Sequence, residues 1–137
     1  MRDFTLGIAA LLFLSCSDSP PTGPGNVRSV QGSWELQSFQ IAGGATGIVE
    51  PGLYTADFAA DGRVSARSDC NRCSASYSAA GTNLEIGSLA CTRAYCGEES
   101  LFDDDVAALD GATSFERPGT SLVIRHPRGS LRFVPKS

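Results

Sequence analysis

The stretch of sequence that decides the fold holds four of the five cysteines of the chain. It reads DCNRCSASY over residues 69–77 and ACTRAYC over residues 90–96, and it contains Cys70, Cys73, Cys91 and Cys96. The second pair has Cys-x4-Cys spacing, which is looser than the paired Cys-x2-Cys motifs of zinc sites. Two disulfides in an exported protein are therefore the interpretation that we adopt. Four cysteines allow three pairings, and spacing alone does not choose among them.

The first two of these cysteines, Cys70 and Cys73, also have the Cys-x-x-Cys spacing of thiol redox proteins. In those proteins the motif opens a helix within a βαβ unit. Here the flanking residues are rich in Ser and Ala and resemble a strand. A thiol redox function therefore stays an alternative, which a low thiol pKa and easy reduction would support.

Composition favours one small β-rich domain. The chain has 137 residues, with 15 Gly and 7 Pro, which is typical of a turn-rich protein. Its 11 basic and 15 acidic side chains give a net charge of −4. This charge provides no basic footprint, so we expect no nucleic-acid partner.

Residues 1–15 are predicted to be a signal peptide. Arg2 supplies a positive charge, and residues 4–14 form an apolar or small run that is too short to span a bilayer. The run ends in Phe-Leu-Ser-Cys, which resembles the bacterial lipobox and makes Cys16 the predicted lipidation site. The alternative is an ordinary signal peptide followed by an incidental cysteine. Lipidation is favoured because Cys16 is the fifth cysteine, and an exported protein rarely leaves one unpaired.

A tether follows the predicted lipidation site. Residues 17–25 are rich in Ser, Pro and Gly, which prevent regular structure, so residues 16–31 are expected to link an acyl anchor to a folded domain at residues 32–137. Ser17, rather than Asp, follows the cysteine. By resemblance to enterobacterial sorting, this residue predicts a lipoprotein of the outer membrane that faces the periplasm.

Alternating apolar and polar residues predict a series of short strands. The expected strands are residues 32–36, 53–59, 63–70, 73–78, 84–86, 113–117, 121–125 and 130–134. Gly-rich residues 42–52 predict a mobile loop between the first two strands. Cys70 is expected on the inner face of its strand. Because Cys70 and Cys73 have opposite parity, we expect a bend or bulge at Asn71 and Arg72, with Asn71 in a structural role.

One helix is predicted over about residues 98–110. Phe102, Val106 and Leu109 recur at helical spacing, and the acidic residues 98 and 99 would lie in the first turn. Gly111 is a plausible stop. Three consecutive acidic residues, 103–105, lie inside this predicted helix. Three successive residues span a wide arc of a helix and cannot converge on one ion, so they are expected to form a solvated face.

No residue pattern points to catalysis. His126 is the only histidine, and it falls in a predicted turn before Pro127. With one histidine, multi-histidine metal sites are excluded, and no Gly-rich phosphate loop precedes the helix. We therefore expect no catalytic residue, no metal site and no cofactor.

The order of these motifs resembles the META domain, the family of the heat-shock protein HslJ. The positions that fit the family pattern are Trp34, Leu36, Cys70, Asn71, Tyr77, Leu84, Ile86, Thr92, Arg93 and Cys96. The resemblance implies a single α+β domain, in which a curved antiparallel sheet packs against one helix. Cys73, Ala75 and Cys91 depart from the pattern. Because the two additional cysteines occur together, the resemblance implies the pairs Cys70–Cys96 and Cys73–Cys91.

The resemblance implies a non-enzymatic lipoprotein of the cell envelope, which binds a partner protein or an apolar ligand in a stress response. The predicted sheet also resembles that of secretin-pilot lipoproteins, which hold acyl chains in an apolar groove. A lipocalin-like carrier is the other binding alternative, suggested by Gly32-x-Trp34 and by the β content. Against it, the chain is short for a full eight-stranded barrel, and the helix precedes the last three strands.

Overall fold

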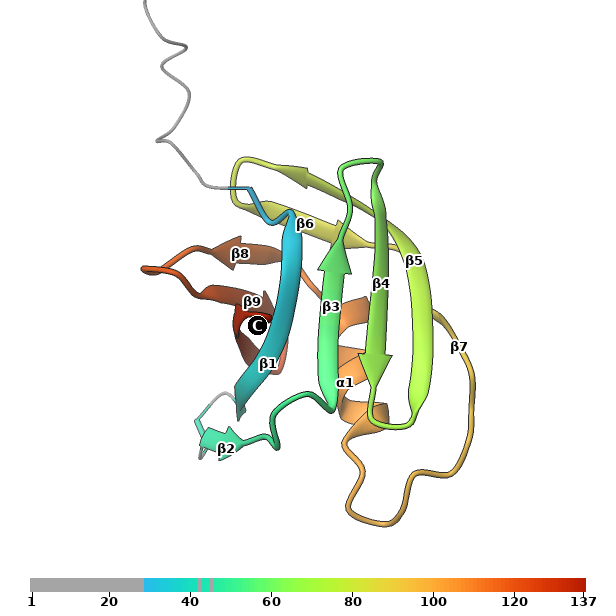
Figure 1. Ribbon diagram of the computed structural model, residues 1–137. Coiled ribbons are helices and arrows are strands. Elements are labelled where there is room, and N and C mark those ends of the chain that lie inside the picture. Colours follow the sequence, from blue (N-terminus) through green and yellow to red (C-terminus); the bar gives the residue numbers. More distant parts are fainter. Residues whose placement is uncertain (1–28, 42, 45) are drawn as a thin grey trace, which may run out of the picture.

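The computed structural model describes residues 29–41, 43–44 and 46–137 (Figure 1). The predicted signal peptide, the lipid anchor at Cys16 and most of the tether lie outside these residues. No helix within the described part of the chain is both long and apolar enough to cross a membrane.

Within the described residues, ten strands and one helix follow one another along the chain. The elements are β1 Gly32–Ile41, β2 Thr46–Ile48, β3 Tyr54–Phe58, β4 Arg63–Ser68, β5 Asn71–Ala80, β6 Asn83–Ile86, β7 Ala90–Cys91, α1 Phe102–Asp110, β8 Ser114–Glu116, β9 Leu122–His126 and β10 Gly129–Pro135. Residues 42–52 were predicted to form a mobile loop. The residues of this range that the structure describes include the short strand β2 and the buried Val49.

Eight of the strands form a closed antiparallel barrel, in the order β1, β3, β4, β5, β6, β8, β9 and β10. The first and last of them pair along their length, from Trp34 opposite Pro135 to Ile41 opposite Gly129. The short β2 and β7 add to β1 and β5 outside this circuit. The predicted α+β class, with a curved open sheet, is therefore wrong. The fold is mainly β, with 51% of the described residues in strands and 8% in the helix.

Short connections explain how so few residues close a barrel. Residues 69 and 70 alone join β4 to β5, with Ser68 opposite Asn71, and other strands are likewise linked by tight turns. Closure also removes both exposed sheet edges, which an open sheet would have to protect. The argument that the chain is too short for eight strands is thus wrong.

The β4–β5 turn corrects the prediction for Cys70. Asp69 has a φ of 55°, a left-handed conformation that Asp tolerates in two-residue hairpin turns. Cys70 is therefore an exposed turn residue and not an inward-facing strand residue. Asn71 begins the next strand with its side chain fully buried. The parity conflict with Cys73 is resolved by a hairpin turn at Asp69 and Cys70, whereas we predicted a bend or bulge at Asn71 and Arg72.

A bulge does occur in β1. The pairing with β10 shifts between Leu36 and Ser38, which places the extra residue at Gln37. Trp34 and Leu36 point into the barrel, and the shift turns Phe39 toward the same side, opposite Leu131. An added residue reverses the alternation of a strand, so the inward side changes from even to odd positions.

The helix begins at Phe102, four residues later than predicted. Residues 98 and 99 form a turn before it, so its first-turn acids are residues 103–105 instead. The backbone before the helix is held in a turn, because Gly97 has a φ of 104° and the N–H of Ser100 donates to its carbonyl. Gly111 ends the helix, as predicted. Figure 1 shows α1 behind the lower ends of β3 and β4.

Inward-facing side chains from both sides of the barrel fill its interior. The largest side chains that are essentially fully buried are Phe115, Phe133, Leu84, Leu109, Leu122, Ile124, Val30 and Val64. Leu109 and Ala108 bring the helix into this core, against β4, β6 and β9. The interior is thus packed with side chains, and α1 covers one end of it.

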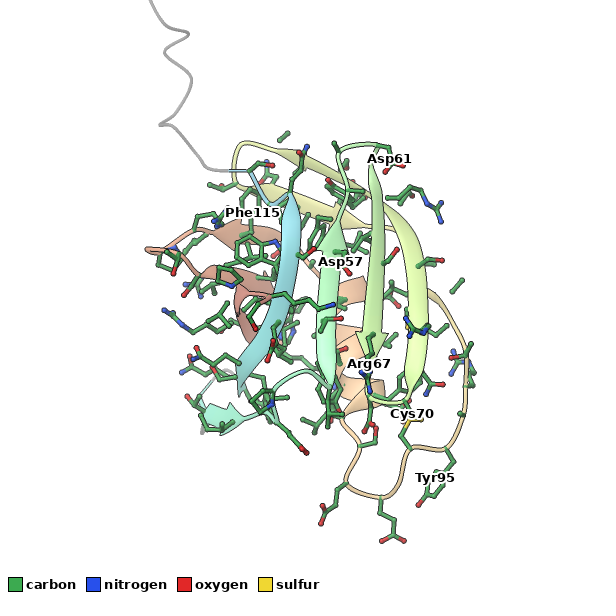
Figure 2. The ribbon with its side chains drawn as sticks, viewed as in Figure 1. Asp57, Asp61, Arg67, Cys70, Tyr95 and Phe115 are labelled. Carbon is green, nitrogen blue, oxygen red and sulfur yellow. A yellow bond between two sulfur atoms is a disulfide. The ribbon has the colours of Figure 1, made fainter. Side chains whose placement is uncertain are left out.

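Two disulfides connect the sheet to the segment before the helix. Cys73 of β5 lies opposite Cys91 of β7 and bonds to it, with 4.0 Å between their Cα atoms. Cys70 bonds to Cys96, with 5.6 Å between Cα atoms. These are the pairs that the family resemblance implies. Figure 2 shows Cys70 at the tip of the β4–β5 turn, close to the loop that carries Tyr95.

Replacing Cys73 and Cys91 together by Ala should lower the free energy of unfolding by about 2–4 kcal/mol, because the cross-link restricts the unfolded chain. Urea unfolding without reductant measures the loss. The double replacement of Cys70 and Cys96 is the matched comparison and should cost at least as much, since its sequence separation is 26 residues rather than 18. An unchanged unfolding midpoint in the first variant would contradict a stabilising role.

Candidate functional site

A pocket of about 480 Å³ lies beside α1 at one end of the barrel. Its walls are α1, the last residues of β1 and the turn between β9 and β10. Most of the lining is apolar: Leu36, Phe39, Ile41, Leu101, Ala107, Ala108, Pro127 and Leu131. The polar side chains in the lining are Gln40, Asp104, Asp105, His126 and Arg128. The volume and this mixture are typical of small-molecule sites.

The β1 bulge gives the pocket its aromatic wall. Without the extra residue at Gln37, the alternation begun by Trp34 and Leu36 would turn Phe39 outward. On its other side, Phe39 packs against Gly47 of β2, where a Cβ atom would overlap the aromatic ring. Gly47 therefore allows the Phe39 ring to lie between β2 and the pocket.

Asp105 is the polar group buried most deeply in the pocket lining. Asp105 is only 5% exposed, and among the described side chains the buried Ser68 hydroxyl is the one polar group that acts on its carboxyl. Ser68 Oγ is buried and has no other partner, so its hydroxyl is the donor available to the Asp105 carboxyl. Buried carboxyls normally have several donors or a counter-charge, and this one has a single neutral donor. The predicted solvated face is thus wrong for Asp105, although Asp103 and Asp104 are exposed.

Burial raises the pKa of Asp105 to about 7, and the nearby Ser68 hydroxyl acts weakly in the opposite direction. The carboxyl therefore changes its charge near neutral pH. No basic side chain contributes to the shift. In particular, Arg128 does not act as the counter-charge of Asp105, although both line the pocket.

His126 lies at the mouth of the pocket and is partly buried. Burial, and to a lesser degree the positive charge of Arg128, lower the pKa of His126, which leaves the ring neutral at pH 7. Its Nδ1 accepts a hydrogen bond of 3.3 Å from the backbone N–H of Arg128. The predicted turn at His126 and Pro127 is present and forms part of the pocket wall.

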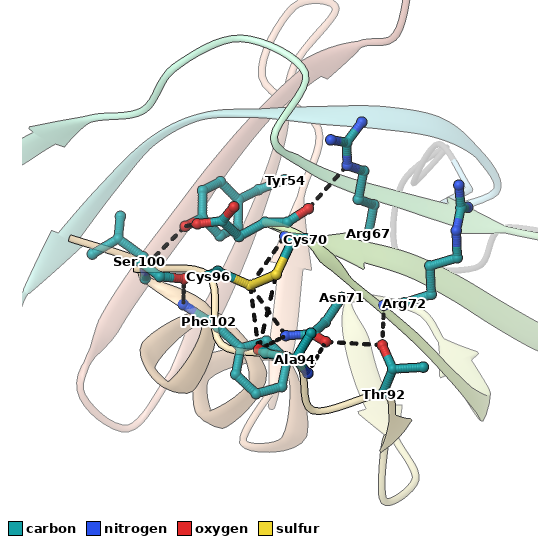
Figure 3. Close-up of a disulfide and its surroundings, with 12 residues drawn as sticks. Tyr54, Arg67, Cys70, Asn71, Arg72, Thr92, Ala94, Cys96, Ser100 and Phe102 are labelled. Carbon is teal, nitrogen blue, oxygen red and sulfur yellow. Dashed lines mark hydrogen bonds between the residues drawn. A yellow bond between two sulfur atoms is a disulfide. The ribbon is translucent and has the colours of Figure 1, made fainter. Parts of the chain in front are cut away.

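Asn71 holds the loop that leads to α1 (Figure 3). Its Oδ1 accepts hydrogen bonds from the N–H of Ala94 at 2.7 Å and from the hydroxyl of Thr92 at 2.9 Å. Its Nδ2 donates to the Ala94 carbonyl at 3.0 Å. The Cys70–Cys96 disulfide lies beside this network. Asn71 is structural, as predicted, but it acts through its side chain and not through its backbone conformation.

Tyr54 fixes the start of the helix. Its hydroxyl oxygen accepts a hydrogen bond of 2.8 Å from the N–H of Leu101, and the hydroxyl donates to Asp69 Oδ2 at 3.3 Å. Burial raises the pKa of Tyr54, so the donating proton is retained at neutral pH. Leu101 lines the pocket. The pocket wall on this side is therefore attached to the barrel by Tyr54, Asn71 and a disulfide.

The cysteines do not form a metal or dithiol site in the structure. Asp69, Cys70 and Cys96 lie close together, but the two sulfur atoms are bonded to each other. Cys70 and Cys73 bond to different partners, whereas a Cys-x-x-Cys redox motif joins its own two cysteines. The arrangement thus gives no support to the redox alternative.

Sequence reasoning missed Asp105 as a site residue, although a signal was present. Asp105 stands four residues after Leu101 and four before Leu109, which places it on the apolar face of the helix. We treated residues 103–105 as one acidic run and did not separate them by face. Phe39 carried a signal as well, because the apolar residues of this strand switch from even to odd positions between Leu36 and Phe39, which is the mark of a bulge that we did not use.

Comparisons with known proteins agree with this description. A model of the family described as META domain matches residues 27–137. A protein from Burkholderia xenovorans, solved by NMR, is similar with a TM-score of 0.66 and 22% identity, over 88% of this chain and 97% of that chain. A crystal structure of a DUF4847 family protein from Bacteroides vulgatus is similar with a TM-score of 0.56 and 15% identity, over 77% and 93%. A comparison with curated proteins finds no match.

Replacing Asp105 by Asn should stabilise the protein increasingly as the pH rises from about 4 to about 7. In the wild type, the carboxyl of the unfolded chain ionises near 3.8, while the folded state keeps its proton up to about 7. The unfolded state thus binds fewer protons in this interval, and stability falls by on the order of a few kcal/mol. Asn has no proton to lose.

Urea unfolding at several pH values measures this difference. Asp103→Asn is the matched control on the exposed side of the same helix, and its stability should follow that of the wild type. Parallel curves for the wild type and Asp105→Asn would contradict the burial of an uncompensated carboxyl.

Proposed function

Because the chain belongs to the META domain family and has a pocket beside its helix, we propose that it is an exported, membrane-anchored lipoprotein that binds a small apolar ligand. It does so without catalysis and without a cofactor. The cell envelope under stress is the setting that the family resemblance implies. The observation that carries the proposal is the pocket of about 480 Å³ with its largely apolar lining.

The lining favours an apolar ligand, because contact with such a ligand would remove the aliphatic and aromatic walls from water. Phe39, Leu36 and Leu131 form one side of the pocket, and Ala107 and Ala108 of the helix form the other. Burying apolar area stabilises a complex by roughly 25 cal/mol per Å² before the costs of association. Few polar groups are present, and such groups usually fix the orientation of a ligand.

The attachment of the helix favours a pocket that exists before binding. The loop before α1 is held by the Cys70–Cys96 disulfide, by Asn71 and by Tyr54. A wall held by a covalent bond and buried hydrogen bonds loses little freedom when a ligand binds, which lowers the cost of association.

The position of the pocket suits a protein tethered at its N-terminus. The described chain begins at Ser29, next to the Gly32 end of β1, where Trp34 Nε1 donates to the Val30 carbonyl at 2.9 Å. The pocket lies at the opposite end of β1, where Ile41 pairs with Gly129. A lipid anchor at Cys16 would therefore be joined to the end of the domain that lies opposite the pocket.

The closed barrel also bears on the lipocalin-like alternative. A lipocalin-type carrier holds its ligand inside the barrel. Here Phe115, Phe133 and Leu122 fill the interior, and the pocket lies at the end, beside α1. We therefore prefer a ligand bound at the end of the barrel to one bound within it.

Binding of N-phenyl-1-naphthylamine, an uncharged apolar dye, tests the proposal. The full chain with Cys16→Ser, which cannot be acylated, should bind the dye at one site with increased fluorescence. Ala107→Trp should weaken binding by roughly tenfold or more, because the indole would occupy the pocket. Ala107 is exposed on the helix, so the change should spare the core.

Ala80→Trp is the control, since Ala80 is exposed on β5 and does not line the pocket. This variant should bind the dye like the Cys16→Ser protein. Absence of dye binding, or equal affinities for the Ala107→Trp and Ala80→Trp variants, would contradict the proposal.

A further inference from the structure

The chemistry of the pocket indicates which apolar ligands it favours. Asp105 lies in the pocket lining and is 95% buried, and its carboxyl has the Ser68 hydroxyl as a neutral partner but no basic side chain that balances its charge. A buried carboxylate without a counter-charge is costly, and a cation that binds directly against it reduces this cost. No described side chain supplies that cation at Asp105, so a ligand can supply it.

We infer that the pocket selects ligands with an apolar body and one protonated amine, and that the ammonium group binds against the carboxyl of Asp105. The inference rests on the proposed function and names the ligand class. The exposed Asp104 carboxylate in the same lining adds negative potential for an approaching amine. The apolar body would lie along Leu36, Phe39 and Leu131.

A bare metal ion fits this place poorly. Hard cations require several oxygen ligands. The only cluster of three His, Cys, Asp or Glu ligand groups among the described residues is that of Asp69, Cys70 and Cys96, and it does not include Asp105. One carboxyl among aliphatic side chains suits an organic ammonium instead. The apolar body of such a ligand contacts the aliphatic walls, so the ammonium does not require several oxygen ligands.

An alkyl carboxylate also fits less well. Its head group could pair with the exposed Arg128 at the mouth, but its chain would then lie against the Asp105 carboxyl and leave that group without a counter-charge. An alcohol can hydrogen-bond to Asp105 but cannot balance its charge. The order of affinity should therefore be amine, then alcohol, then carboxylate.

The test compares three ligands of equal chain length by calorimetric titration at pH 8: octylamine, octanol and octanoate. The protein is the full chain with Cys16→Ser. Octylamine should bind at least roughly tenfold more tightly than octanol. Asp105→Asn should reduce octylamine affinity to that of octanol and leave octanol unchanged. Asp103→Asn, on the exposed face, should bind all three like the Cys16→Ser protein.

A second measurement follows octylamine binding as the pH is lowered. Lowering the pH from 8 to 5.5 should weaken octylamine binding by roughly tenfold or more, because Asp105 then takes up a proton while the amine stays charged. Asp104, His126 and Arg128 also face the pocket, and His126 can gain a proton as the pH falls. The pH effect should therefore be much smaller in Asp105→Asn than in the Cys16→Ser protein, and an equal effect in both would overturn the assignment to Asp105.

The outcomes separate the inference from the proposed function. If the three ligands bind with equal affinity, or octanoate binds best, the pocket is a ligand site but the preference for amines is wrong. If none of the three binds and the naphthylamine dye does not bind either, the proposed function itself fails.

Discussion

The antiparallel pairing of β1 with β10 is the constraint on which the rest of the structure depends. It joins strands from opposite ends of the described chain and turns a meander into a closed barrel. The two backbones approach so closely that a Cβ atom at Gly129 would overlap the Gln40 carbonyl oxygen, and Gly129 adopts a φ of +150° that other residues avoid. A closed barrel has two open ends, through which its apolar interior would be exposed to water. The helix covers one of them, with Leu109 and Ala108 in the core.

The same end carries the pocket, because one short helix does not fill it. The bulge at Gln37 directs Phe39 into the remaining space, and the turn at His126 forms the opposite wall. Asp105 is the exception to this apolar packing, since its position on the apolar face of the helix buries a carboxyl that gains the Ser68 hydroxyl but no counter-charge. Residues that reduce stability in this way are found at functional sites more often than elsewhere. Asp105, at the end of the barrel that the helix covers, is therefore the residue that most directly supports the proposed ligand binding.

Much of the fold could be predicted from local patterns. The alternation of Leu84 and Ile86 and the spacing of Phe102, Val106 and Leu109 depend on near neighbours, and the structure has a strand and a helix there. Barrel closure could not be predicted, because it depends on pairing between distant strands, which alternation does not encode. The β4–β5 turn was missed because Asp69 and Cys70 continue the alternation of the preceding strand. Asp105 was predictable from helical spacing, whereas the depth of its burial follows only from closure.

The most direct test of the account is the ionisation of Asp105 itself, followed by the NMR signal of its carboxyl carbon as the pH is changed. The account predicts a midpoint near 7, because burial without a counter-charge raises the pKa of this carboxyl to about 7. A midpoint near 4, the ordinary range for an aspartate, would show that water or a partner reaches the carboxyl. The burial of a carboxyl without a counter-charge, on which the ligand preference rests, would then be wrong.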